Sequence, residues 1–137
     1  MKFQNDWRQK SIEILEKGDS GEVPQDESSI VQRLCRLRKF PVEEFTTDDI
    51  RFMIIQEIGL PYLLTLAIKK ISENLFTEGS YYEGDLLAAI LLIKPDNRKG
   101  NKEHWFEIDG LIKDRLDELC GFRPRLEIEN FYVAKYN

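Results

Sequence analysis

The sequence has few of the residues that build metal sites and nucleophilic active sites: one histidine, His104, and two cysteines, Cys35 and Cys120. A structural zinc site takes about four ligands, and neither a second histidine nor a cysteine stands near His104 in the sequence. Each cysteine follows a leucine in a helix-like segment, which is typical of a small buried residue rather than of a disulfide or a metal clip. We therefore expect no metal ion and no cofactor, and we interpret His104 as a surface residue of a helix.

Enzyme motifs are also absent from the sequence. The eight glycines never take the spacing G-x-G-x-x-G or G-x-x-x-x-G-K-[ST] that cradles phosphates, and no G-x-S-x-G elbow presents a nucleophile. Asp48 and Asp49 follow two threonines, and we interpret them as helix caps rather than catalysts. We predict that the protein is not an enzyme and has no catalytic residue. The remaining enzymatic hypothesis pairs His104 with a carboxylate.

No long hydrophobic run occurs in the sequence. The longest apolar stretch, from Leu86 to Ile93, has eight residues and falls short of the roughly twenty that a bilayer crossing needs. The N-terminal segment lacks the apolar core of a signal peptide. We therefore expect a cytoplasmic protein with no membrane partner.

Basic residues are outnumbered: 20 lysines and arginines stand against 25 aspartates and glutamates, which gives a net charge of −5. Most of this excess lies in residues 46–93, which contain three bases and seven acids. Such a field repels phosphate backbones and attracts basic proteins. The charge therefore disfavours direct binding of nucleic acid.

Four bases, Arg33, Arg36, Arg38 and Lys39, nevertheless share one predicted helix. They could grip phosphate, which would make the protein a small helical adaptor or regulator that binds nucleic acid or another protein. They could equally be structural, because cations are favourable near the C-terminal end of a helix and acidic residues stand close by. Both interpretations stay open at the level of sequence.

The chain of 137 residues and 16.2 kDa is long enough for one domain, and we assign residues 1–137 to it. Apolar residues recur at helical spacing in six segments, so we predict a mainly α fold: a single compact bundle of about five or six helices. These segments are 11–17, 29–40, 46–58, 61–75, 86–93 and 105–119. We expect glycines to end several of them, Gly18 and Gly59 included. After Pro124 the pattern changes, and we predict an irregular or strand-like C-terminal tail.

Two further expectations concern the core and the loops. We predict a mobile connector over residues 96–102, which contain no apolar side chain. The residues that occupy the apolar faces of the strongest periodic segments should be buried: Ile54, Ile58, Leu63, Leu64, Ile68, Leu86, Ile90, Leu111 and Leu116.

Three segments carry a resemblance to a known family: SIEILE (11–16), RLCRLRKFPVEEFTTDDIRFMIIQEIGLPYLL (33–64) and TEGSYYEGDLLAAIL (77–91). In this order they resemble the immunity proteins of bacterial contact-dependent growth inhibition systems. The resemblance covers about residues 11–93. It implies a cytoplasmic protein without enzymatic activity that binds the C-terminal toxin domain delivered by a neighbouring cell. Such toxins are often nucleases, and the immunity protein blocks the active site or another surface that the toxin requires.

The candidate contact residues lie in two acidic loops. An immunity protein against a nuclease should offer carboxylates for steering and aromatic side chains for contact area, because the toxin needs bases to hold phosphates. We predict a one-to-one complex with a basic toxin domain. The first predicted contact set is Glu78, Tyr81, Tyr82, Glu83 and Asp85, and the secondary set is Glu22, Asp26 and Glu27.

Overall fold

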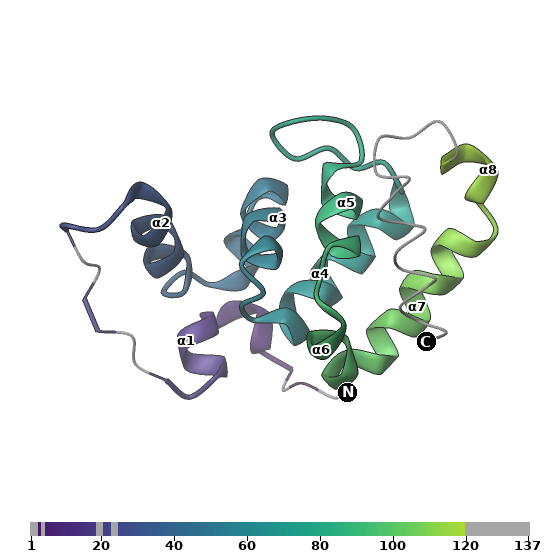
Figure 1. The fold of residues 1–137 in the computed structure, drawn as a ribbon. Coiled ribbons are helices and arrows are strands. Elements are labelled where there is room, and N and C mark those ends of the chain that lie inside the picture. Colours follow the sequence, from purple (N-terminus) through teal and green to yellow (C-terminus); the bar gives the residue numbers. More distant parts are fainter. Residues whose placement is uncertain (1–2, 4, 19–20, 23–24, 120–137) are drawn as a thin grey trace.

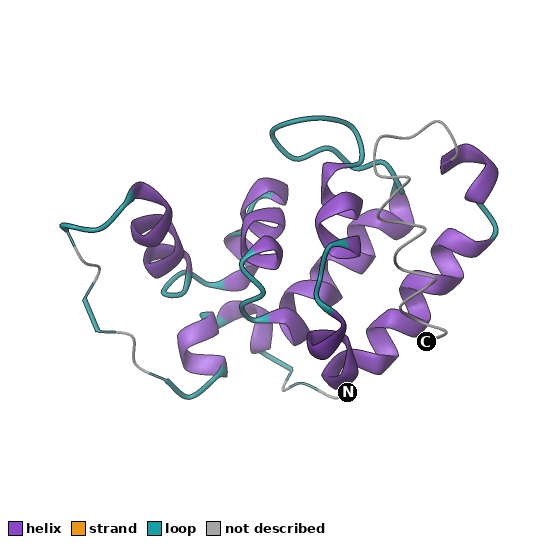
Figure 2. Ribbon diagram, in the orientation of Figure 1, coloured by secondary structure: helices purple, strands orange, loops and turns teal. Residues whose placement is uncertain are grey.

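Helices form the regular secondary structure of the described part of the chain (Figures 1 and 2). The structure is a computed structural model, and it describes residue 3 and residues 5–18, 21–22 and 25–119. The elements in chain order are η1 (Trp7–Gln9), α1 (Ile12–Leu15), α2 (Ser29–Leu37), η2 (Val42–Glu44), α3 (Thr47–Ile55), α4 (Leu60–Glu73), α5 (Asp85–Leu91), α6 (Pro95–Arg98), η3 (Lys99–Asn101), α7 (Lys102–Lys113) and α8 (Leu116–Leu119).

The mainly helical fold class is therefore confirmed. No strand occurs in the described ranges, where β pairing is limited to one antiparallel bridge between Ser11 and Pro41. The predicted strand-like tail lies outside the described residues. None of the described helices combines the length and the apolar character that a bilayer crossing needs.

Helices α3, α4 and α5 pack against one another at the centre of the molecule, and α7 packs against α4 (Figure 1). The burial prediction holds for six side chains: Ile54, Leu63, Leu64, Ile68, Leu86 and Ile90 are buried. It is too strong for Ile58 and Leu111, which are only partly buried against the same core. The side chain of Leu116 lies outside the described set.

Local sequence sets the start of the central helices. Thr46 accepts a hydrogen bond from the Asp49 amide while the Asp49 carboxylate accepts one from the Thr46 amide, so α3 begins with a capping box. Helix α4 begins after Gly59, whose φ is +66°, and a proline stands in its first turn. A Cβ at Gly59 would lie 2.7 Å from Ile12 Cδ1, so the position also needs glycine for space.

The expected helix ends at Gly18 and Gly59 are wrong by one or two residues. The residues that take left-handed backbone after α1 and α3 are Lys17 (φ 56°) and Glu57 (φ 57°). Glu57 is useful there because its side chain reaches the start of α6: Oε1 accepts hydrogen bonds from the Lys94 amide and from Asn97 Nδ2. A tertiary contact therefore compensates for a backbone conformation that glycine would adopt more easily.

The predicted mobile connector over residues 96–102 is instead helical, because it spans α6, η3 and the start of α7. Pro95 stands at the first position of α6, where a proline is favourable. The Arg98 guanidinium donates hydrogen bonds to the carbonyl oxygens of Ile93 (2.9 Å) and Leu91 (3.1 Å), at the C-terminal end of α5. Hydrogen bonds from a polar side chain to backbone carbonyl oxygens thus fix this stretch. A count of apolar residues does not reveal such bonds.

The predicted surface position of His104 is wrong: the residue is buried, with 7% of its surface exposed. Its Nε2 lies 2.8 Å from Thr65 Oγ1, and this contact joins α7 to α4. The Thr65 hydroxyl donates its one proton to the Pro61 carbonyl oxygen, so His104 Nε2 is the donor in the contact. Burial lowers the pKa of His104, and this effect outweighs the opposing charges of Glu107 and Glu103.

Removing a buried side chain from the centre should be costly. We expect Leu64→Ala to reduce the free energy of unfolding by about 2–5 kcal/mol, because Leu64 is fully buried in the hydrophobic core. Urea denaturation measures this change. The control Ile14→Ala, at an exposed apolar position, should change it by less than about 0.5 kcal/mol. Equal effects of the two substitutions would contradict the placement of the core.

The buried imidazole also predicts a pH dependence of stability. Because the pKa of His104 in the folded protein lies below the ordinary histidine value of 6.5, the unfolded chain binds more protons, and stability falls as the pH drops below 6.5. Urea denaturation at about pH 7.5 and about pH 5.5 measures the change. In His104→Gln, which keeps a side-chain N–H for Thr65, the decline should be smaller. An equal decline in the variant would assign it to other groups.

Candidate partner-binding surface

A loop over residues 77–84 leads into α5 and is closed at both ends by hydrogen bonds. The Gly84 amide donates to the Phe76 carbonyl oxygen (3.0 Å), and the Thr77 amide donates to the Asn74 carbonyl oxygen (3.0 Å). Within the loop the amides of Gly79 and Tyr81 donate to the two separate oxygens of the Asp85 carboxylate. One buried side chain therefore fixes the course of the loop.

Gly79 marks the tightest point of this loop. A Cβ there would lie 3.1 Å from both carboxylate oxygens of Asp85 and 3.3 Å from Asp48 Oδ1. These distances are shorter than ordinary van der Waals contact between such atoms. The loop backbone thus lies directly over two carboxylates, and glycine is the residue that leaves them room.

An ion-pair network continues from Asp85 through α3 to α2, and we call it the carboxylate–arginine network (Arg33, Asp48, Asp49, Arg51, Asp85). Arg51 Nε lies 2.9 Å from Asp48 Oδ1 and 3.9 Å from Asp85 Oδ2. Arg33 Nη2 lies 3.0 Å from Asp48 Oδ2 and 2.9 Å from Asp49 Oδ1. Carboxylates and guanidinium groups alternate along this series of contacts. Each charge therefore has a neighbour of opposite sign, which offsets the loss of hydration on burial.

The network shifts the pKa of its central carboxylate. Burial alone would raise the pKa of Asp48, but hydrogen bonds and charge from Arg51 and Arg33 outweigh it, so the pKa is lowered. The stabilisation that this lowered pKa represents is present above the ordinary aspartate pKa of 3.8 and is lost as the pH falls below it. At neutral pH the Asp48 carboxylate is therefore ionised.

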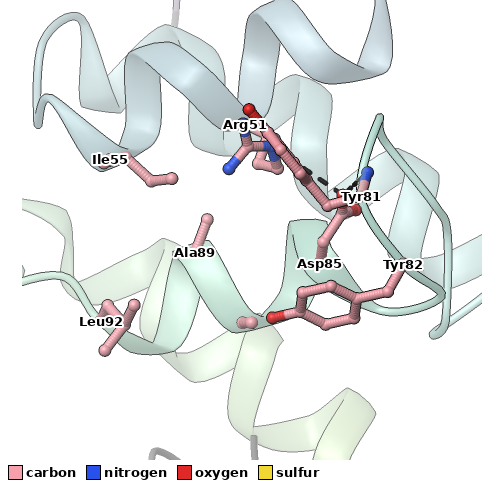
Figure 3. A pocket seen from close by; sticks show the side chains of 8 residues that line it. Arg51, Ile55, Tyr81, Tyr82, Asp85, Ala89 and Leu92 are labelled. Atoms are coloured by element: carbon pink, nitrogen blue, oxygen red, sulfur yellow. Dashed lines mark hydrogen bonds and ion pairs between the residues drawn. The ribbon is translucent and has the colours of Figure 1, made fainter. Parts of the chain in front are cut away.

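A surface groove of about 410 Å³ lies between α3, α5 and this loop (Figure 3). We call it the α3/α5 groove; it is lined by Arg51, Ile55, Tyr81, Tyr82, Asp85, Ala88, Ala89 and Leu92. The Tyr81 ring lies against Arg51, with the guanidinium carbon 4.5 Å from the ring centroid. In Figure 3 the two tyrosines lie at one end of the groove, and Ile55 and Leu92 lie at the other.

The structure separates the first predicted contact set into three kinds of position. Glu78, Tyr81 and Glu83 are exposed, with Tyr81 71% exposed. Tyr82 is half-buried and lines the groove. Asp85 is 3% exposed and holds the loop from inside. Asp85 is therefore placed to position the loop rather than to touch a partner.

The secondary set lies elsewhere. Glu22, Asp26 and Glu27 are exposed in the connection between α1 and α2. In Figure 1, α2 and α3 stand between this connection and the loop over residues 77–84. The two acidic loops thus form separate parts of the surface.

The structural interpretation of the basic helix is favoured over the phosphate-gripping one. Arg33 is bound to Asp48 and Asp49, Arg38 lies 3.6 Å from Glu16, and Lys39 lies 3.2 Å from Glu13. Ion pairs with α1 and α3 therefore occupy three of the four bases, and Arg36 stays exposed. A set of bases that is already paired offers little charge to a phosphate backbone.

Metal-ligating side chains do not gather in the part of the chain that the structure describes, where no group of three or more His, Cys, Asp or Glu could hold an ion. Cys35 is a free, half-buried thiol. Cys120 lies outside the described residues.

The family model of CDI immunity proteins, where CDI is contact-dependent growth inhibition, matches residues 14–108. The chain belongs to this family. The matched segment of this CDI immunity protein contains the whole carboxylate–arginine network, the loop over residues 77–84 and the α3/α5 groove. Comparisons with curated proteins and with solved structures gave no match. Family membership implies that the partner of this immunity protein is a CDI toxin.

The geometry around Asp85 predicts the result of a nearly isosteric substitution. In Asp85→Asn one of the two loop amides should face an NH₂ group instead of an acceptor, and Arg51 should lose a charge partner. We expect amide exchange at Gly79 and Tyr81 to accelerate by about tenfold or more, measured by hydrogen exchange with NMR. The exposed control Glu83→Gln should leave both rates unchanged. Unchanged rates in Asp85→Asn would show that the loop does not depend on this carboxylate.

Proposed function

We propose that this CDI immunity protein neutralises its toxin by binding the toxin's C-terminal domain in a one-to-one complex, with the loop over residues 77–84 as the main contact. The observation that carries the proposal is the presentation of Tyr81 between two exposed acids, Glu78 and Glu83. Among the described residues neither acid has an ion-pair partner. Their charge is thus available to a basic protein.

We propose that the toxin is a nuclease. A nuclease presents bases that hold phosphates, and carboxylates that meet those bases compete with the substrate for the same surface. Neutralisation then needs occlusion of the active or substrate-binding surface and no turnover, in keeping with a protein that is not an enzyme. The cytoplasm is where such a toxin would meet its substrate, and we propose that the complex forms there.

The two parts of the contact set would act differently. Glu78 and Glu83 lie at the surface, where charge mainly raises the rate of encounter. Tyr81 and Tyr82 supply aromatic area, which mainly slows dissociation. Glu22, Asp26 and Glu27 would extend the acidic field toward α2 and serve as secondary contacts.

The charge prediction can be tested with a double reversal. The probe is an inactive form of the C-terminal domain of the cognate CDI toxin, at low and moderate salt. We expect Glu78→Lys with Glu83→Lys to slow association by about tenfold, measured by surface plasmon resonance, since the reversal turns attraction into repulsion.

A control with the same change of net charge separates local from general effects. Asp96 and Glu107 are exposed on α6 and α7, away from the loop in Figure 1. Their double reversal to lysine should slow association by no more than about twofold, because charge that is distant from the contact is screened by salt. If both double variants associated equally fast, the acidic loop would not be the steering surface.

A further inference from the structure

The α3/α5 groove brings together three large, exposed apolar or aromatic side chains. Ile55 at the end of α3 is 44% exposed, Leu92 after the end of α5 is 59% exposed, and Tyr81 is 71% exposed. All three line the same groove, although they come from three different segments. Exposed apolar side chains that converge in this way are typical of a binding surface, whereas single ones are common and need no explanation.

Small side chains on α5 keep the groove open. Ala88 and Ala89 both line it. In Figure 3, Ala89 lies between the apolar pair Ile55 and Leu92 and the aromatic pair Tyr81 and Tyr82. Both alanines are buried, so their methyl groups add apolar surface without filling the space. The groove therefore has an apolar floor with room for an inserted side chain.

The charged groups of the groove are already used within the protein. Arg51 is paired with Asp48 and lies against Tyr81, and both oxygens of Asp85 accept hydrogen bonds from the loop backbone. A small polar ligand needs free polar groups that fix its orientation. The groove instead offers apolar area, which suits an anchoring side chain of a protein partner.

The rim of the groove indicates the charge of that partner. Glu78 and Glu83 stand on the loop that forms one wall, and their acidic field complements a basic protein. The toxin domain of the proposed function is such a protein, and we infer that one of its aliphatic or aromatic side chains inserts into the α3/α5 groove, next to a base that faces Glu78 or Glu83. This inference rests on the proposed function and assigns Ile55, Ala88, Ala89 and Leu92 to the contact.

The experiment compares two apolar positions of equal exposure. Leu92 in the groove and Ile14 on α1 are each 59% exposed. With the inactive C-terminal domain of the cognate CDI toxin as the probe, Leu92→Gln should raise the dissociation constant about tenfold or more, mainly through faster dissociation. Ile55→Gln should act in the same direction. The matched control Ile14→Gln should change the constant by no more than about twofold.

Three results would overturn the inference, and they differ in what they leave standing. If Leu92→Gln and Ile55→Gln both behave like Ile14→Gln while reversal of Glu78 and Glu83 weakens binding, the groove is not the anchor and the proposed function stands. If the wild-type protein does not bind the toxin domain at all, the proposed function fails together with the inference. If sedimentation finds a wild-type dimer that Leu92→Gln dissociates without changing toxin binding, the groove is covered by a second copy of this chain.

Discussion

The buried carboxylate of Asp85 is the interaction on which the candidate surface depends. It stands at the first position of α5, accepts hydrogen bonds from the amides of Gly79 and Tyr81, and faces Arg51 on α3. A buried charge is stable only when it is paired and its lone pairs are satisfied. The loop backbone and the α3 arginine meet that need together, so the same contacts that make Asp85 tolerable also fix the loop that presents Tyr81.

The arrangement gives an ordered loop without a long hydrophobic anchor. Binding costs free energy when it immobilises flexible segments, and a loop that is already held in place reduces that cost. The charged side chains around the groove are of two kinds. Some, such as Arg51, are engaged in contacts within the protein, and others, such as Glu83, are exposed and available to a partner. The network extends to Arg33, so α2 also contributes to the frame of the loop.

Sequence periodicity was enough to predict the central helices, because apolar spacing and caps such as Thr46 are local signals. The burial of His104 was not predictable in this way, since its partner Thr65 is 39 residues away in the sequence. The same holds for the carboxylate–arginine network: Asp48 precedes Arg51 by one helical turn, which is a visible signal, but Arg33 and Asp85 come from other segments. The exposed loop was predictable from its acids and tyrosines. The groove beside it was not, because three segments that are separate in the sequence form it together.

The close packing at Gly79 separates loop positions that are constrained by the fold from exposed positions that are not. A side chain there would press on the carboxylates of Asp85 and Asp48, so the frame tolerates little change at these sites. Glu78 and Glu83 are exposed, and substitutions at such positions cost about 0.5 kcal/mol or less of stability. Specificity for a different toxin could therefore evolve by exchange of the exposed residues alone, on a scaffold that keeps its shape.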